Sequence, residues 1–281
     1  MDMHCAQIKV FIIGKGYIGS YLLKNLKTSN IKCLNIERSI YTNTLKLNNF
    51  LKEHALPGDI IINCAAYIGK DSIKDCEDDI DQTLETNSNL PCRVFAECIA
   101  QKLRFIHIST GGLFQCQNNI NKAYTEGETP NNTLSAYYFS KFLAELALNG
   151  ISGKHPSNNL TIVRIHMPIS ETIHKNNLAC KLIKYPILID NVNTITPLCD
   201  LVNALKCIIE YNLQGTFNVV NPSPIKIKRI YDIISNNRSS DKTIKEGVHE
   251  TILDSSKIDK KSGQRVFCNL SDHLAEIGSN F

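Results

Sequence analysis

The sequence lacks the features that define several large classes of protein. It contains no apolar run long enough to span a membrane and no charged-then-apolar signal pattern at its start. The formal net charge is only +4, and the lysines and arginines are scattered rather than arranged in a stripe. No internal repeat or low-complexity tract is present. These absences argue against nucleic-acid and membrane partners, so neither is expected.

The eleven cysteines also lack the spacing of a metal site or of a disulfide framework. Their number is odd, they are dispersed, and no Cys-x-x-Cys pair or neighbouring histidine cluster occurs. Cys64 and Cys98 lie inside apolar runs, where a thiol behaves as a small buried hydrophobe. We therefore expect no metal and a reducing, cytoplasmic compartment.

A glycine-rich turn follows the first apolar run. Residues 8–13 are β-rich and lead into a Gly-x-Gly-x-x-Gly pattern, after which a helix is plausible. Strand, glycine turn and helix in this order indicate a dinucleotide-binding turn, although a purely structural turn is the alternative. The pyrophosphate would bind at the helix N-terminus. The predicted cofactor-binding residues here are Gly14, Gly16, Tyr17, Ile18 and Gly19.

The choice of cofactor depends on the end of the second predicted strand, residues 31–36. Glu37, Arg38 and Ser39 follow it. An acid at this position holds the ribose diol of NAD, whereas a base holds the 2′-phosphate of NADP. Arg38 with Ser39 favours NADPH, with NAD as the less favoured cofactor and a solvated loop as the alternative.

Strands and helices alternate up to about residue 165. Further strands are predicted at 59–66, 104–110 and 160–165, and helices at 90–103 and from 136 onward. Ala65 and Ala66 are small, as a strand end beneath a cofactor requires. The alternation predicts a doubly wound parallel α/β sheet. We assign residues 1–165 to a cofactor-binding domain and 166–281 mainly to a smaller substrate-binding cap, with segments returning to the sheet.

Tyr137 and Lys141 occupy one face of the helix that begins at residue 136. They are four residues apart, so an ammonium can lie one turn from a phenol. A nearby positive charge favours the ionised phenol and lowers its pKa. Such a tyrosine could exchange a proton with a carbonyl or an alcohol at neutral pH. An ordinary surface pair is the alternative.

With these motifs placed, the chain resembles the extended short-chain dehydrogenase/reductases of nucleotide sugars, which have a Rossmann fold. More narrowly, it is similar to UDP-4-keto-6-deoxy-glucose 3,5-epimerase/4-reductases and dTDP-4-dehydrorhamnose reductases. Segments 108–114, 163–170 and 217–222 carry this likeness, together with the glycine turn and Tyr-x-x-x-Lys. It implies an NADPH-dependent 4-ketoreductase of a UDP-linked 4-keto-6-deoxy sugar, acting alone or as a homodimer.

The resemblance also implies roles for individual residues. Thr110 would bind the C4 carbonyl, Tyr137 would protonate it, and Lys141 would bind the nicotinamide ribose. Lys181 matches the lysine that the family uses for epimerisation. The family's cysteine partner is Gly112 here, which argues against full 3,5-epimerisation. The implied substrate-binding residues are Thr110, Gly111, Gly112, Met167, Asn218 and Asn221.

Three interpretations stay open on the sequence alone. The first is an epimerase/4-reductase that makes UDP-L-rhamnose or a related 6-deoxy-L-sugar. The second is a 3-epimerase/4-reductase of a UDP-2-acetamido-2,6-dideoxy-hexulose, which would suit the missing cysteine. The third is a non-catalytic, NADP-sensing regulatory subunit. UDP and dTDP are not distinguished.

Overall fold

The computed structural model describes residues 7–116, 122–155, 159–236, 242–247 and 250–281. The chain divides into two compact units. The first unit comprises the residues up to Ser109, Asn132–Val163 and Gln214–Thr216. The second comprises Thr110–Asn131, Arg164–Leu213 and Phe217–Phe281. In the described part of the chain, no helix has the length and apolar character needed to cross a membrane.

A six-stranded sheet has the order β10-β5-β4-β3-β1-β2. Its strands are β1 (Ile8–Ile13), β2 (Ile31–Ile36), β3 (Ile60–Asn63), β4 (Arg104–Thr110), β5 (Leu160–Ile165) and β10 (Gly215–Asn218). β1 pairs in parallel with both β2 and β3, and β3 pairs in parallel with β4. The strand order reverses between β1 and β3. In such sheets ligands bind beyond the carboxyl ends of the strands at this reversal.

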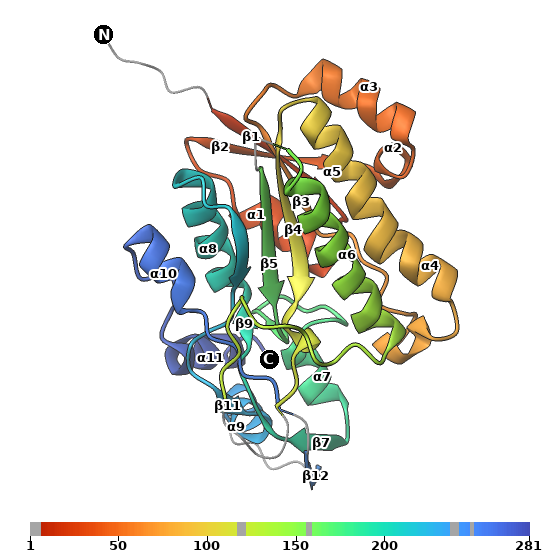
Figure 1. Cartoon of the computed structure of the whole chain (residues 1–281). Coiled ribbons are helices and arrows are strands. Elements are labelled where there is room, and N and C mark those ends of the chain that lie inside the picture. The colour runs from red at the N-terminus through yellow and green to blue at the C-terminus, as the bar shows by residue number, and fades with distance from the viewer. Residues whose placement is uncertain (1–6, 117–121, 156–158, 237–241, 248–249) are drawn as a thin grey trace. The chain divides into compact units, whose positions relative to one another are not determined.

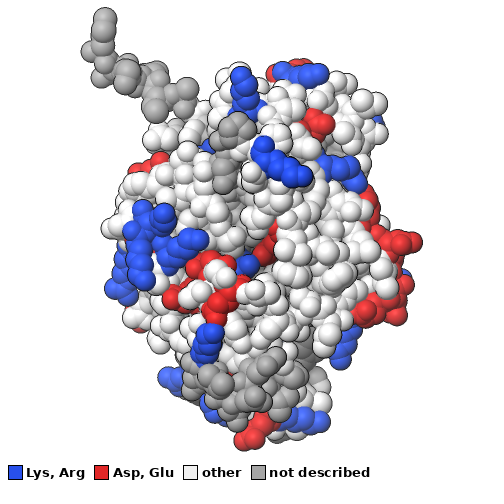
Figure 2. Space-filling view, viewed as in Figure 1, with Lys and Arg blue, Asp and Glu red and all other residues white. Residues whose placement is uncertain are grey.

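The helices of the first unit connect these strands. They are α1 (Tyr17–Asn25), α2 (Arg38–Tyr41), α3 (Thr44–His54), α4 (Ile80–Leu84), α5 (Leu90–Ala100) and α6 (Ala136–Ser152). A 3₁₀ turn, η1 (Ile73–Cys76), precedes α4, and one π-helical turn, η2 (Glu85–Asn89), joins α4 to α5. In Figure 1, α3, α5 and α6 lie along the same side of the strands. Acidic side chains gather over α4 in Figure 2.

The core of the first unit explains why these segments become buried strands. Phe11 and Phe105 on the strands pack in one cluster with Leu51, Phe95 and Leu148 from α3, α5 and α6. The rings of Phe95 and Phe105 stack with their centroids 5.4 Å apart. Strands that are apolar on both faces fit a parallel sheet that is covered on both sides.

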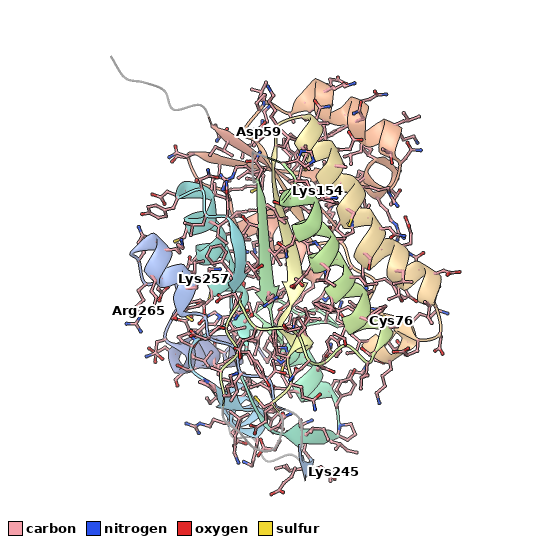
Figure 3. All side chains as sticks on the ribbon, in the orientation of Figure 1. Asp59, Cys76, Lys154, Lys245, Lys257 and Arg265 are labelled. Atoms are coloured by element: carbon pink, nitrogen blue, oxygen red, sulfur yellow. The ribbon has the colours of Figure 1, made fainter. Side chains whose placement is uncertain are left out.

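The second unit is built from short strands and helices. Its elements are η3 (Gly111–Leu113), β6 (Pro168–Ile169), α7 (Leu178–Lys184), β7 (Ile187–Asp190), β8 (Val192–Asn193), β9 (Thr196–Pro197), α8 (Leu198–Glu210), β11 (Ile225–Lys226), α9 (Ile227–Ile234), β12 (Thr243–Glu246), α10 (Ser256–Ser262) and α11 (Leu270–Gly278). Leu182, Leu188, Ile230 and Leu274 share its apolar core. Basic side chains gather over α10 (Figure 2). One of them, Lys257, is labelled in Figure 3.

The predicted fold class is confirmed, with one local difference. The strand predicted at 59–66 is shorter, because only Ile60–Asn63 stays in the sheet. Asp59 lies just before it and accepts hydrogen bonds from the backbone nitrogens of Lys9 and Leu56, at 2.9 and 2.8 Å. Figure 3 shows Asp59 near the start of this strand. Beyond Asn63, the chain leaves the sheet to pass the glycine turn.

Candidate active site

The glycine turn brings backbone against backbone. Gly14 has φ +87°, and a Cβ there would lie 2.3 Å from the nitrogen of Ala65. A Cβ on Gly19 would lie 2.1 Å from the carbonyl oxygen of Gly14. Gly16 differs, because a Cβ on it would meet no described atom within 4 Å. Gly14 and Gly19 are therefore required by packing, while Gly16 leaves open space at the N-terminus of α1.

A pocket of about 450 Å³ lies at this turn, within the first unit. It is at the point where the strand order reverses. The predicted cofactor residues Gly14, Gly16, Arg38, Ala65 and Ala66 all line it. Tyr17 and Gly19 are buried, and Ser39 is exposed outside the described lining. Ile18 is half-buried on α1 and is also outside that lining.

The two charged residues after β2 have different surroundings. Glu37 accepts a hydrogen bond of 2.6 Å from the side-chain nitrogen of Asn35. Arg38 lines the pocket, together with Lys15. Two positive side chains therefore border the glycine turn, which suits a ligand with several phosphates.

Several residues that line this pocket were not predicted from the sequence. The additional lining residues are Lys15, Tyr41, Thr42, Cys64, Tyr67, Gln82, Glu85, Thr86, Leu90 and Arg93. Glu85 forms an ion pair of 2.6 Å with Arg93, which lowers the pKa of Glu85. Lys15 lies inside the glycine turn, but Gln82, Glu85 and Thr86 carry no motif, and the path of the chain through α4 and η2 brings them here.

Helix α6 presents Tyr137 and Lys141 one turn apart. Ser135 caps its start by accepting a hydrogen bond of 3.2 Å from the nitrogen of Tyr138. The rings of Tyr137 and Tyr138 meet edge to face, with centroids 5.4 Å apart. Burial raises the pKa of Tyr137, and Tyr138 and Cys76 add to the rise. The lowering that we predicted from Lys141 is thus not the dominant effect.

The side chain of Lys141 is buried against β4. Its Nζ donates to the carbonyl oxygen of Ile108 at 2.9 Å and lies 3.2 Å from Nε2 of His107. Burial lowers the pKa of Lys141 to about 8, and the charges of Glu145 and Cys64 oppose this. Glu145 in turn accepts a hydrogen bond of 2.5 Å from the hydroxyl of Ser109.

Asn63 determines which ring nitrogen of His107 carries the proton. Its Oδ1 accepts from the nitrogen of Ala65 at 3.0 Å, so its Nδ2 faces His107 Nδ1, also at 3.0 Å. A neutral imidazole that accepts at Nδ1 carries its proton on Nε2, toward Lys141. Burial holds the pKa of His107 well below its usual value, with the charge of Lys141 as a second cause. His107 therefore connects Asn63, at the end of β3, to Lys141.

The π-helical turn η2 positions α6 from the other side. Asn87 donates to the carbonyl oxygen of Tyr67 at 2.9 Å and to the hydroxyl of Ser140 at 3.1 Å. Ser140 itself donates to the carbonyl oxygen of Tyr137 at 2.7 Å, and Ser88 donates to that of Ser140 at 2.6 Å. π-helical turns are frequent at functional sites. Here the turn connects Tyr67, which lines the pocket, to the backbone of α6 at Tyr137 and Ser140.

The predicted substrate-side residues lie in the second unit. Thr110 accepts a hydrogen bond of 3.1 Å from the nitrogen of Gly112, which starts the turn η3. A Cβ on Gly111 would lie 2.4 Å from Leu253 and 3.2 Å from His166. A side chain on Gly111 would therefore require the buried Leu253 to move, independently of any role in binding.

The remaining predicted residues differ in accessibility. Met167 is half-buried with φ +43°, which is unusual for a residue other than glycine. Burial lowers the pKa of Lys181 on α7. Asn218 is fully buried and donates to the carbonyl oxygens of Tyr124 and Asp254, at 3.1 and 3.0 Å.

Asn221 is also fully buried. It donates to Asp200 Oδ2 at 2.9 Å and to the carbonyl oxygen of Cys268 at 3.1 Å. The side-chain amides of Asn218 and Asn221 are thus engaged within the second unit, and substrate contact by either residue stays a prediction.

Solved structures with this fold include two of similar size. The UDP-rhamnose synthase of Acanthamoeba polyphaga mimivirus superposes with a TM-score of 0.84 at 18% identity, covering 98% of this chain and 100% of that one. The dTDP-4-dehydrorhamnose reductase of Bacillus anthracis, solved with NADP, gives a TM-score of 0.79 at 18% identity, covering 96% and 97%. At these identities the likeness establishes the fold.

Sequence comparison gives a relative and a family. A bifunctional dTDP-4-dehydrorhamnose 3,5-epimerase/dTDP-4-dehydrorhamnose reductase of Arabidopsis thaliana is 25% identical over 178 residues, which is 62% of this chain. The match spans 57% of the length of that relative. The model of the NAD dependent epimerase/dehydratase family matches residues 10–195, about two thirds of the chain. The chain therefore belongs to the NAD dependent epimerase/dehydratase family.

Proposed function

We propose that this protein is an NADPH-dependent 4-reductase of a UDP-linked 4-keto-6-deoxy sugar. The observation that carries the proposal is Lys141, buried one turn after Tyr137 in the unit that also holds the glycine-turn pocket. The Arabidopsis relative is named for dTDP-4-dehydrorhamnose and the mimiviral structure for UDP-rhamnose, which supports a 4-keto-6-deoxy nucleotide sugar as the class of substrate.

The residues around the pocket fit a dinucleotide. Gly16 leaves open space where the first N–H groups of α1 begin, as a bound pyrophosphate requires. Arg38 borders the pocket, while Glu37 is engaged by Asn35, which supports NADPH over NADH. When bound, the cofactor supplies the hydride for C4.

Tyr137 is the proposed proton donor to the C4 oxygen. Its raised pKa keeps the phenol protonated at neutral pH, which is the form that a reduction consumes. Lys141 is the proposed partner of the nicotinamide ribose, and its lowered pKa lets it exchange protons near pH 8. Thr110 is proposed as a second hydrogen-bond donor to the same oxygen.

Epimerisation at a single carbon is proposed beside the reduction. Inverting a carbon next to a ketone removes a proton from one face and returns one to the other. Lys181 can provide one such group, because burial lowers its pKa. Gly112 provides none. With Tyr137 or a water molecule as the group that returns a proton on the other face, Lys181 can still serve one carbon. We therefore expect C3 to be inverted and C5 not, which makes a 2-acetamido-2,6-dideoxy-hexulose already inverted at C5 the second candidate substrate.

The direct test is oxidation of NADPH with a panel of 4-keto nucleotide sugars. The panel contains the UDP and dTDP forms of the 4-keto-6-deoxy-hexose and the UDP-2-acetamido-2,6-dideoxy-hexulose. Turnover of one of them, absent with the corresponding 4-hydroxy sugars, supports the proposal. No turnover with any member would contradict it.

A second experiment resolves the epimerisation. The protein is incubated in heavy water with the 4-keto sugar and oxidised cofactor, and deuterium is followed by NMR. Label at C3 alone supports the proposal. Comparable label at C5 would instead indicate that both C3 and C5 are epimerised, and it would favour UDP-L-rhamnose as the product.

A further inference from the structure

Four side chains with metal-ligating atoms meet in the second unit. Cys199 and Asp200 lie in the first turn of α8, Cys268 precedes α11, and His273 is on α11. The ligand atoms of Cys199, Asp200 and Cys268 all lie within 4.8 Å of one another. Sγ of Cys199 lies 3.4 Å from Nε2 of His273.

These distances suit a small tetrahedral ion. Zinc binds sulfur at about 2.3 Å and nitrogen at about 2.0–2.1 Å, which places the two ligands about 3.5 Å apart in a tetrahedron. The separation of Cys199 and His273 already matches this value. Sulfur and imidazole ligands favour zinc over magnesium or calcium, which prefer oxygen.

A second layer of contacts orients two of the four ligands. Nδ1 of His273 lies 3.5 Å from Oε2 of Glu276, so Nε2 points toward Cys199. Asp200 Oδ1 accepts from the nitrogen of Cys268 at 2.8 Å, and Oδ2 accepts from Asn221 at 2.9 Å. Each carboxylate oxygen retains a lone pair. Metal-binding histidines commonly carry such a carboxylate on the other nitrogen.

The charges of the cluster also favour a cation. Asp200 is fully buried, and no lysine or arginine of the described residues forms an ion pair with it. A buried carboxylate is costly unless it is paired or binds a metal. We propose that Cys199, Cys268, His273 and Asp200 form a zinc site that joins the start of α8 to α11.

This site departs from the expectation that the chain has no metal. Its ligands come from positions 199, 200, 268 and 273, so no short sequence motif predicts the site. None of them belongs to the network of Asn63, His107 and Lys141. The proposal is therefore independent of the proposed reductase activity, and its expected effect is on stability.

Zinc binding to the full-length protein tests it. The reduced protein is stripped with chelator, desalted, and titrated with Zn²⁺ against a chromophoric competitor. We expect one tight equivalent, and affinity at least about 100-fold weaker in Cys199→Ser, Cys268→Ser and His273→Gln. Glu276→Gln should weaken it about tenfold. With Co²⁺, thiolate-to-cobalt charge-transfer absorption should develop and should be lost in Cys199→Ser.

Cys207→Ser is the matched control, since Cys207 is on the same helix and its Sγ faces Gln264 at 3.9 Å instead. It should bind zinc like the unaltered protein, and zinc should raise the Tm of both but not of Cys199→Ser. Glu276→Gln changes an exposed side chain of α11, so it tests the site even if a cysteine variant fails to fold. Absence of a tight zinc equivalent in the titration, or equal zinc affinity in all variants, would overturn the proposal.

Discussion

Nζ of Lys141 lies 3.2 Å from Nε2 of His107, and both side chains are buried in the first unit. Because Asn63 donates to the other ring nitrogen, the imidazole proton points at the lysine. Two donors then face each other whenever Lys141 is an ammonium. As a neutral amine, Lys141 can accept a hydrogen bond from His107 while it still donates one to the carbonyl oxygen of Ile108. This contact and burial act in the same direction on the pKa of Lys141.

The stability of the protein should therefore depend on pH through Lys141. Its pKa falls from 10.5 to about 8 on folding. Between these values the unfolded chain binds a proton that the folded chain has lost, so raising the pH favours the folded state. From pH 8 to pH 10 the gain is about 2 kcal/mol. Urea unfolding at both pH values should show this gain relative to Lys141→Met, which lacks the group.

The control for that experiment is Lys154→Met. Lys154 is exposed shortly after the end of α6 (Figure 3), so this variant should keep the gain. If the stability of Lys141→Met changed with pH in parallel with the unaltered protein, Lys141 would not be the group responsible.

His107→Gln should move the pH dependence of the reduction. Glutamine can present a carbonyl oxygen to Lys141 in place of an N–H, which stabilises the ammonium and raises the pKa of Lys141. The alkaline limb of the kcat profile should shift upward by about one pH unit. His54→Gln, at a partly exposed histidine of α3, should leave the profile in place. An unmoved limb in His107→Gln would contradict control of Lys141 by His107.

Tyr137→Phe should abolish the reduction and leave cofactor binding nearly unchanged. The hydroxyl is the proposed proton donor, and Tyr137 is not among the described residues that line the nucleotide pocket. NADPH affinity and turnover are measured on the same preparation, with Tyr138→Phe as the neighbouring control. Near-normal turnover of Tyr137→Phe would show that another group donates the proton.

Arg38→Ala should weaken NADPH binding selectively. A charge-assisted contact with the 2′-phosphate is worth roughly 1.5–3 kcal/mol, so its loss should cost one to two decades of affinity. NADH binding should change little, and Lys32→Ala, at an exposed position of β2 outside the described lining, should affect neither. Isothermal titration with both cofactors makes the comparison. Equal losses for NADPH and NADH would exclude the 2′-phosphate contact.

The sequence predicts the sheet well because its signals are local. The strands at 8–13, 31–36, 104–110 and 160–165 have the predicted bounds, since short stretches rich in β-branched and other apolar residues mark them. The glycine turn is equally local. Helix α3 is not predicted, and no helix or strand is predicted within residues 239–281, where α10 and α11 form.

The site is predictable only where neighbouring residues form a motif. Gly14, Gly16 and Arg38 follow from the chain order of strand and turn, and they line the pocket. Asn63 and His107 lie 44 residues apart, and their role depends on register between β3 and β4, which pairs them directly. The shift in the pKa of Tyr137 was predicted with the wrong sign, because spacing reveals the nearby lysine but not how the surrounding protein shields the phenol and the amine from water.

The chain passes between its two units at residues 109, 131, 163, 213 and 216, so neither unit is one continuous piece of sequence. A fragment that stops at residue 165 would keep residues 110–131 but lose most of the second unit to which they belong, and it would lose 214–216 from the first unit. No single cut in the polypeptide would therefore separate the two units into two complete fragments. The second unit likewise could not be exchanged as one contiguous segment, because three separate stretches of the chain build it.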